Sequence, residues 1–497
     1  MCRHPRRRRP ARLAAQLRPA GLRLGAVVRH RRHPAPGPGR GPVRHPASTA
    51  KGVGVYPRIG VVGLGYVGLT LSAVLAERGY RVCGVDANPE VLESLRRGRL
   101  HLFEPGLERI LGAAVGDSLS LRTELDPEVD AVIICVSTPV DPHSHRPDLT
   151  NLARAAADVA RTCAPETLVV VRSTVPVGTC RRVVLPALTR SWGTARLVMA
   201  PERTIQGQAL RELVELPQVV GGLDEQSLRA GQDLFAGIAR QIVPVSSLEA
   251  AELVKLSNNC HTDLIYAYGN EVALVAERHG LDPLEVIRAA NLDYPRPDLA
   301  RPGYVGGGCL SKDPYLMVES AGDAPPFLVA AARRLNERLP GHVAETVVEL
   351  LRQERGETAG ARLAVLGWAY KGWPPTDDMR GAPIDTMMPI FQAAGLTVSG
   401  HDALVPPEVI RRHGGEPVSL DEAFRNSDAV LVLTDHPDYC AIQVEKLLGE
   451  VRPAVVYDSW RILDEAALVA AGVRYAGIGY RPARGQAGAR TLPTVPA

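Results

Sequence analysis

The chain has 497 residues, more than one ordinary hydrophobic core accommodates, so two or three domains are expected. Its formal net charge is +4, from 58 basic and 54 acidic residues. Residues 1–50 contain 13 arginines and no acidic residue, so the remainder has a net charge near −9. An acidic body argues against a nucleic-acid-binding surface. No segment approaches the roughly twenty apolar residues of a membrane span, which argues against a membrane protein.

Residues 1–54 are predicted to form a disordered basic tail, because Arg6–Pro10 and Pro34–Gly39 lack aliphatic periodicity. A nucleic-acid or membrane arm is one interpretation. A passive extension, or a start codon placed too far upstream, is favoured because the body needs no such partner. The apolar run Leu22–Val28 is short and interrupted by Arg23, so a signal peptide is not expected.

The eight cysteines are scattered and form no C-x-x-C motif. Neither a disulfide framework nor a zinc site is therefore expected, and no metal is predicted. This cysteine usage fits a protein of the reducing cytoplasm.

Residues 55–247 alternate between strands and helices. A strand at Arg58–Gly63 precedes a helix at Leu69–Arg78, and a second strand follows at Arg81–Val85. Further strands are expected at Ala131–Val136, Leu168–Val171 and Leu197–Met199. This alternation predicts a parallel, doubly wound sheet.

Residues 248–345 are predicted to be helical, since Glu249–Arg278 and Pro283–Ala290 have apolar residues at helical spacing. Such a block commonly serves as spacer and dimer contact. A second α/β series is expected over residues 346–481, followed by a disordered tail at 482–497. Its strands are predicted at Leu363–Leu366, Thr397–Ser399, Ala429–Leu433 and Ala454–Tyr457. The expected fold is thus α/β, with two Rossmann-like doubly wound domains joined by a central helical dimerisation region.

A glycine loop links the first strand to the first helix. Its sequence, Gly63-Leu-Gly65-Tyr66-Val67-Gly68, matches G-x-G-x-x-G, whose glycines allow backbone N–H groups to approach a pyrophosphate. Asp86 ends the next strand, where an acidic residue accepts a hydrogen bond from a ribose hydroxyl and repels a 2′-phosphate. Any glycine-rich turn could match the motif alone. With strand, helix and Asp86 in register, the loop predicts NAD binding by all six residues named here.

Three later segments carry reactive residues. Ser173–Thr179 (STVPVGT) follows a strand, and Glu249–Asn259 places Lys255 and Asn259 four residues apart on one helix face. Gly306–Asp313 (GGGCLSKD) places a cysteine after three glycines and an aspartate four residues later. A small buried cysteine is the commoner structural role. Here the glycines are expected to leave room for a ligand.

With these segments the chain resembles the UDP-glucose/GDP-mannose dehydrogenase family, over roughly residues 57–480. Further stretches that match the family are Phe103–Leu107, Ser137–Pro139, Ala200–Glu202, Gly367–Lys371 and Thr376–Arg380. The resemblance implies NAD-dependent oxidation of the C6 hydroxyl of a nucleotide-linked hexose to a carboxylate. It also implies a homodimer or larger homo-oligomer and a place in polysaccharide biosynthesis.

The resemblance also implies the catalytic residues. Cys309 would be the nucleophile, forming a thiohemiacetal with the intermediate aldehyde and then a thioester. Lys255 would stabilise the oxyanion, and Asp313 would orient or activate the hydrolytic water, with Asn259 completing the cluster. Thr174 and Glu202 match family positions that hold water near C6, although a strand-end threonine and a surface glutamate are the plainer interpretations.

Binding residues follow from the same resemblance. Thr138, Thr174 and Arg380 would contact the cofactor, and Arg296 would reach into the neighbouring subunit's sugar site. The substrate-binding residues would be Glu202, Lys255, Asn259, Arg296, Gly306 and Lys371. A solvated surface charge is the alternative for Lys371 and Arg380.

Departures from the family pattern bear on the substrate. Ala200–Arg203 stands where the glucose-specific branch usually has N-P-E-F, and Thr204–Leu210 and Leu216–Gly222 look more like the UDP-N-acetylhexosamine branch. That branch often has His where this chain has Gly308. A substrate of the UDP-N-acetyl-D-mannosamine type is therefore expected, with UDP-glucose or dTDP-glucose as the alternative.

Two other classes of protein share part of this pattern. The β-hydroxyacid dehydrogenases share a similar first domain and helical middle, but they need no cysteine and lack a second nucleotide-binding sheet domain. A non-catalytic nucleotide-sugar-binding protein would be expected to lose its reactive residues, which here are all present. Both remain minor alternatives.

Overall fold

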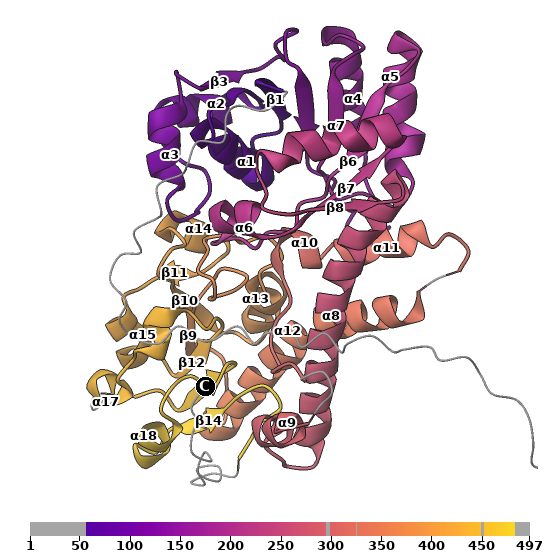
Figure 1. Ribbon diagram of the computed structural model, residues 1–497. Coiled ribbons are helices and arrows are strands. Elements are labelled where there is room, and N and C mark those ends of the chain that lie inside the picture. The colour runs from indigo at the N-terminus through magenta and orange to yellow at the C-terminus, as the bar shows by residue number, and fades with distance from the viewer. Residues whose placement is uncertain (1–55, 295–298, 325, 449–451, 483–497) are drawn as a thin grey trace, which may run out of the picture. The chain divides into compact units, whose positions relative to one another are not determined.

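A computed structural model describes residues 56–294, 299–324, 326–448 and 452–482. It contains two β-sheets joined by a helical region (Figure 1), which confirms the predicted α/β fold. The predicted N-terminal tail, and all but residue 482 of the predicted C-terminal tail, lie outside the described residues. None of the helices within those ranges is both long and apolar enough to cross a membrane.

The first sheet has eight strands in the order β3-β2-β1-β4-β5-β6-β7-β8. They are β1 (Arg58–Val62), β2 (Arg81–Val85), β3 (Leu119–Arg122), β4 (Ala131–Ile134), β5 (Leu168–Val171), β6 (Arg196–Met199), β7 (Gln218–Gly222) and β8 (Ile242–Val245). Central strands such as β4 and β5 are buried at every position, as expected of a sheet covered on both faces. All neighbouring pairs are parallel except β6 and β7. The strands predicted from the sequence pair in parallel as expected, and the antiparallel pair involves β7, which was not among them.

Helices cover both faces of the first sheet. They are α1 (Tyr66–Glu77), α2 (Pro89–Arg96), α3 (Leu107–Ala114), α4 (Thr150–Thr162), α5 (Leu185–Trp192), α6 (Ala209–Glu215) and α7 (Glu225–Ala236), with a π-helical turn, η1 (Cys180–Val184), before α5. Side chains of α1, α2, α3 and α7 share one core and those of α4 and α5 another, and Figure 1 shows α4 and α5 side by side. Local caps fix the helix starts, because the Asn88 and Asp224 side chains accept hydrogen bonds from the first-turn amides of α2 and α7.

The central region is helical, as predicted. It comprises α8 (Leu248–Arg278), α9 (Pro283–Asn291), α10 (Gly307–Leu310), α11 (Asp313–Ser320) and α12 (Phe327–Arg355). The Ser247 hydroxyl caps α8, a helix of 31 residues that packs against both α11 and α12 (Figure 1). The segment that carries Cys309 and Asp313 thus lies between two long helices.

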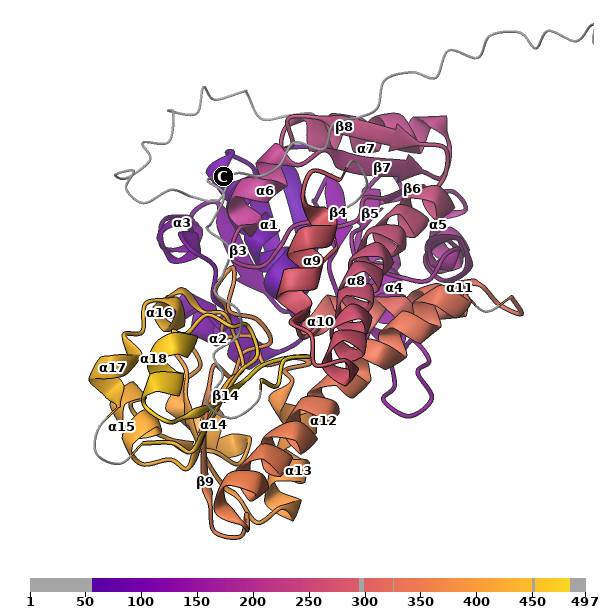
Figure 2. The same cartoon turned by 90° about the horizontal axis from the view of Figure 1, so that it is seen from below.

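The second sheet has six parallel strands in the order β11-β10-β9-β12-β13-β14, which is the Rossmann order. They are β9 (Arg362–Leu366), β10 (Thr397–His401), β11 (Glu416–Pro417), β12 (Ala429–Val432), β13 (Val455–Asp458) and β14 (Arg474–Ala476). Its helices are α13 (Ile384–Ala393), α14 (Pro407–Arg412), α15 (Leu420–Arg425), α16 (Pro437–Cys440), α17 (Val444–Leu447) and α18 (Glu465–Ala470). Figure 2 shows α12 and α13 on one side of this sheet and α15, α17 and α18 on the other, matching its two separate cores.

Candidate active site

The glycine loop between β1 and α1 has the geometry that a dinucleotide site requires. Gly63 has φ +91°, and a Cβ at Gly68 would lie 1.8 Å from the Gly63 carbonyl oxygen, so both positions require glycine. A Cβ at Gly65 would meet no atom within 4 Å, which leaves open space at the first turn of α1. The loop therefore fits a pyrophosphate at the N-terminus of a 12-residue helix.

Asp86 follows β2 and borders this loop. Its two carboxylate oxygens accept from the amides of Leu64 (2.8 Å) and Asn88 (2.9 Å), which fixes the side chain where a ribose is expected. Val67 lies half-buried in the first turn of α1. The Tyr66 hydroxyl donates to the buried Glu104 carboxylate, so it points toward a neighbouring loop of the chain.

The turn that carries Cys309 is closely packed against the second sheet domain. A Cβ at Gly306 would lie 2.3 Å from the Gly381 carbonyl oxygen, and one at Gly307 would lie 2.8 Å from the Tyr370 ring. At both positions the chain itself fills the space that a side chain would need, so packing requires these glycines, and substrate binding by Gly306 stays a prediction. Cys309 is nevertheless exposed, so its thiol is accessible.

Two predicted catalytic residues, Asn259 and Asp313, are in contact near this turn, and Lys255 lies one helical turn away. Asp313 is fully buried and accepts from Asn259 Nδ2 on one carboxylate oxygen (2.5 Å) and from Lys312 Nζ on the other (2.7 Å). Lys255 lies one turn before Asn259 on α8 and is only 6% exposed. Its Nζ has no hydrogen-bond partner within the described residues, so it is available to a ligand.

Thr174 and Thr138 lie at the ends of β5 and β4. Thr138 is buried, and its hydroxyl donates to the Thr174 carbonyl (2.6 Å), which joins the two strand-end loops. The STVPVGT loop is also hydrogen-bonded to helix α8. Glu252 of α8 accepts from the amides of Gly178 (2.5 Å) and Cys180 (2.8 Å). Thr174 is thereby fixed relative to the helix that carries Lys255.

Glu202 forms a buried ion pair with Arg172. Its other oxygen accepts from the amides of Arg203 and Thr204, both at 2.7 Å. Burial alone would raise the pKa of the Glu202 carboxyl, but Arg172, the Thr204 amide and the Lys255 charge together hold it below its ordinary value. Glu202 therefore anchors its loop as a fixed anion, and its role near C6 stays a prediction.

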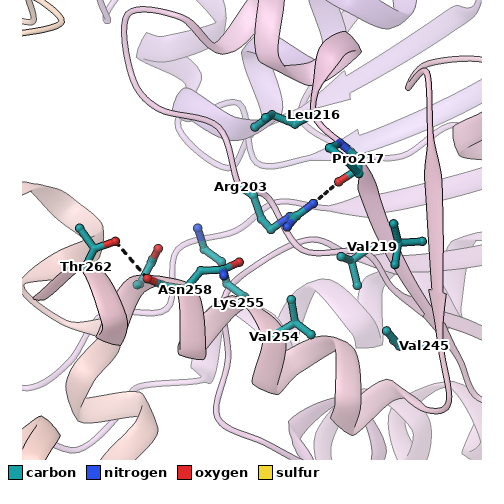
Figure 3. Close-up of a pocket in the computed structure, with 11 residues that line it drawn as sticks. Arg203, Leu216, Pro217, Val219, Val245, Val254, Lys255, Asn258 and Thr262 are labelled. Carbon is teal, nitrogen blue, oxygen red and sulfur yellow. Dashed lines mark hydrogen bonds between the residues drawn. The ribbon is translucent and has the colours of Figure 1, made fainter. Parts of the chain in front are cut away.

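A cavity of about 560 Å³ opens beside Lys255. Figure 3 shows Arg203 reaching toward the Pro217 carbonyl, with Lys255 and Asn258 on the α8 side of the hollow. The lining residues are Arg203, Leu216, Pro217, Val219, Val243, Val245, Val254, Lys255, Asn258, Asn259 and Thr262. Largely apolar walls with two cationic side chains and two asparagine amides suit a ligand that accepts hydrogen bonds.

The remaining predicted binding residues lie in different surroundings. Lys371 donates to the Gln206 carbonyl (2.8 Å), and burial lowers its pKa to about 8. Arg380 pairs with Asp378 (2.7 Å) and lies against the cysteine turn, since a Cβ at Gly308 would be 2.8 Å from its Cζ. Arg296 lies outside the described residues.

Several residues that support the site are not predicted by the sequence. Lys312, Arg172, Glu104 and Glu252 all contact predicted site residues or their loops. Glu252 carried a usable signal, since it lies three residues before Lys255 on one face of a predicted helix. The sequence contains no comparable signal for Arg172, because a single arginine at a strand end is ordinarily a surface charge.

Comparisons with known proteins identify the family of the chain. Sequence profiles of the UDP-glucose/GDP-mannose dehydrogenase family match residues 57–239 (NAD binding domain), 249–338 (central domain) and 364–465 (UDP binding domain). A UDP-N-acetyl-D-mannosamine dehydrogenase of Pyrococcus horikoshii is 33% identical over 431 residues, covering 85% of this chain and 99% of that protein. An NDP-N-acetyl-D-galactosaminuronic acid dehydrogenase of Ralstonia nicotianae is 31% identical, covering 80% and 95%.

Solved structures give the same result. The UDP-D-ManNAc dehydrogenase of P. horikoshii superposes with a TM-score of 0.76 at 32% identity, over 85% of this chain and 99% of that one. A UDP-glucose dehydrogenase of Pyrobaculum islandicum gives 0.73 at 29% identity, over 86% and 98%. The chain therefore belongs to the UDP-glucose/GDP-mannose dehydrogenase family and is an NAD-dependent nucleotide-sugar dehydrogenase.

Proposed function

We propose that this enzyme oxidises the C6 hydroxyl of a UDP-N-acetylhexosamine to the uronic acid, through a covalent intermediate on Cys309. The observation that carries the proposal is the hydrogen bond between Asn259 and the buried Asp313, four residues after the exposed Cys309 and one helical turn from the buried Lys255. The sugar is inferred from two relatives, a UDP-N-acetyl-D-mannosamine dehydrogenase and an NDP-N-acetyl-D-galactosaminuronic acid dehydrogenase. The product would serve polysaccharide biosynthesis.

The residues divide the four-electron oxidation into steps. NAD, when bound, would supply the hydride acceptor for each of the two oxidations at C6. The first oxidation removes a hydride and the hydroxyl proton, which passes to solvent, and gives an aldehyde. The Cys309 thiolate adds to its C6, and protonation of the resulting oxyanion by solvent gives a thiohemiacetal. Loss of the second hydride and of the hydroxyl proton leaves a thioester, so the reactive aldehyde is never released.

Hydrolysis completes the reaction. Asp313, oriented by Asn259 and Lys312, takes a proton from water, whose oxygen adds to the thioester carbon. The Lys255 ammonium donates to the oxyanion formed in this addition and in the thiohemiacetal step. Collapse of that tetrahedral adduct breaks the carbon–sulfur bond, releasing the carboxylate and regenerating the Cys309 thiolate.

The substrate test is a panel of UDP-, dTDP- and GDP-sugars assayed with NAD by NADH absorbance. We expect kcat/KM to be highest for a UDP-N-acetylhexosamine of the ManNAc type. Higher kcat/KM for UDP-glucose or dTDP-glucose would establish the alternative, which the likeness to the P. islandicum enzyme supports. Binding of all sugars without NADH formation would contradict catalysis altogether.

We further propose a homodimer or larger homo-oligomer, working in the cytoplasm. Apolar side chains exposed along α8 and α9 support self-association; they are Leu253, Ile265, Tyr268, Val275, Val286 and Leu292. The seven cysteines within the described residues are free thiols, which fits a reducing compartment. Sedimentation velocity of the purified enzyme tests the oligomeric state, and a monomer at micromolar concentration would contradict it.

A further inference from the structure

A buried guanidinium spans the turn that carries Cys309. Arg333 of α12 is 2% exposed and donates from Nη1 to the Leu310 carbonyl (2.8 Å). From Nη2 it donates to the Val305 carbonyl (3.4 Å). These two carbonyls flank residues 306–309, so one side chain contacts both ends of the turn.

Arg333 is itself held in place by neighbouring buried groups. Its Nη1 pairs with Asp263 Oδ1 of α8 at 2.8 Å, and both side chains are at most 3% exposed. Asn336, one turn after Arg333 on α12, donates to the same carboxylate oxygen and to the Asp263 carbonyl, both at 2.9 Å. The guanidinium therefore has a single well-defined orientation.

The network continues to the start of the cysteine segment. Asn270 of α8 is fully buried, accepts from the Gly303 amide (2.8 Å) and donates to the Gly303 carbonyl (3.0 Å). It also donates to Asn336 Oδ1 (3.0 Å). Residues 303–310 are thus bound at three points by side chains of α8 and α12.

Stability alone is a poor explanation for this arrangement. A buried ion pair is often no more stabilising than apolar residues of the same volume, because both charges lose their hydration. Here Asp263 Oδ2 is buried without a hydrogen-bond partner in the described part of the chain, which adds to the cost. Arg333 Nε makes no hydrogen bond there either, although it lies 3.3 Å from Glu337 Oε1. What the network does provide is one fixed geometry for the segment it contacts.

We propose that Arg333, oriented by Asp263 and Asn336, is a positioning residue that fixes the Cys309 turn for attack on the C6 aldehyde. The proposal rests on the proposed role of Cys309 as nucleophile. The guanidinium acts only through the Val305 and Leu310 carbonyls. Displacing a reacting atom by about 1 Å can reduce a rate about a hundredfold.

The test variant is Arg333→Lys, whose ammonium can pair with Asp263 but lacks the fork that reaches both carbonyls. We expect kcat to fall by between about ten- and a hundredfold while KM for NAD stays within about twofold. Hydrogen exchange of the residue 306–310 amides should become faster. The alkylation rate of Cys309 should shift relative to that of Cys440, an exposed thiol in the same sample.

Asp428→Asn is the control, because it removes a carboxylate paired with Arg355 (2.8 Å) in the second sheet domain. It should leave exchange at residues 306–310 and the Cys309 alkylation rate unchanged. If Arg333→Lys does not fold, Asn270→Ala, which releases Gly303, is measured against the same criteria. Exchange and alkylation do not depend on Cys309 being the nucleophile, so they separate this proposal from the proposed function.

Two results would overturn the inference. One is wild-type kcat in a folded Arg333→Lys enzyme. The other is a loss of kcat with unchanged exchange at residues 306–310, or with faster exchange spread evenly over the whole chain. Faster exchange confined to the cysteine segment, together with the loss of kcat, supports it.

Discussion

At Cys309 an exposed thiol stands four residues before a fully buried carboxylate, Asp313. The difference suits their proposed roles, since the nucleophile must reach the substrate and the base must keep one orientation. Asn259 and Lys312 bind separate oxygens of Asp313, so neither oxygen can rotate away without losing a hydrogen bond. Lys255 is left free to respond to the charge that forms on the substrate.

Cys309→Ser tests the nucleophile. A hydroxyl is of similar size but is a far poorer nucleophile than a thiol at neutral pH, and its ester hydrolyses reluctantly. We expect steady-state turnover to fall by at least about a thousandfold, with nucleotide-sugar binding retained. Cys440→Ser, at an exposed cysteine of α16, is the matched control and should keep wild-type activity. Wild-type turnover by Cys309→Ser would contradict the proposed chemistry.

Lys371 gives a prediction about pH. Burial lowers its pKa to about 8, so its ammonium is present below pH 8 and lost above it. If this charge binds the nucleotide sugar, the Kd measured by calorimetry without NAD should rise as pH increases from 7 to 9.5. Lys371→Met should bind weakly with no such dependence, whereas Lys446→Met, at an exposed lysine, should behave as wild type. A wild-type Kd that is constant over this range would exclude the role.

Many residues of the candidate site could be predicted, because helical spacing or a sequence motif identified them. The pairing of Lys255 and Asn259 follows from helical periodicity, and Asp313 from its place in the cysteine motif. Lys312 and Arg333 could not be predicted, because a lone cation on a helix or in a loop is ordinarily solvated. Their importance depends on which carboxylate tertiary packing brings next to them.

On the scale of single elements, α8 connects the cofactor-binding sheet to the catalytic groups. This helix carries Glu252, Lys255 and Asn259 at helical spacing, and Glu252 is only 1% exposed. The bounds of α8 could be predicted from apolar periodicity within one residue at its start. The contact between Glu252 and the amides of the STVPVGT loop could not, since it joins residues more than 70 positions apart.

Glu252→Gln tests that connection. The carboxylate accepts two buried amides, whereas an amide side chain offers one acceptor and one donor, so one N–H would lose its partner. We expect a loss of about 1–3 kcal/mol in the free energy of unfolding by urea, with a lower kcat. Glu249→Gln is the matched control. It removes a largely exposed pair with Arg181 and should cost less than about 1 kcal/mol. Equal effects of the two substitutions would contradict a special role for Glu252.

At the scale of the whole molecule, the two sheets follow from strand–helix alternation, and the Rossmann strand order of the second could be expected from it. The antiparallel pair β6 and β7 could not, because a short connection through α6 does not reveal strand direction. The glycines before Cys309 show a second limit of predicting structure from sequence. Sequence indicates where a Cβ is not tolerated, but only the fold shows that Tyr370 and Gly381, from the second sheet domain, occupy the space.

Contacts among the two sheet domains and the central helical region bear on how many NADH are formed for each sugar oxidised. The cysteine turn packs against the second sheet domain, while Asp313 is bound to α8, whose Glu252 holds a loop of the cofactor-binding domain. One site built from all three parts can keep the aldehyde covalently bound until hydrolysis. We therefore predict two NADH for each sugar consumed, with no aldehyde captured by an added hydrazine during turnover. One NADH per sugar, with trapped aldehyde, would show that oxidation stops after the first step. In that case Cys309 and Asp313 would have no part in catalysis, however well the turn is positioned.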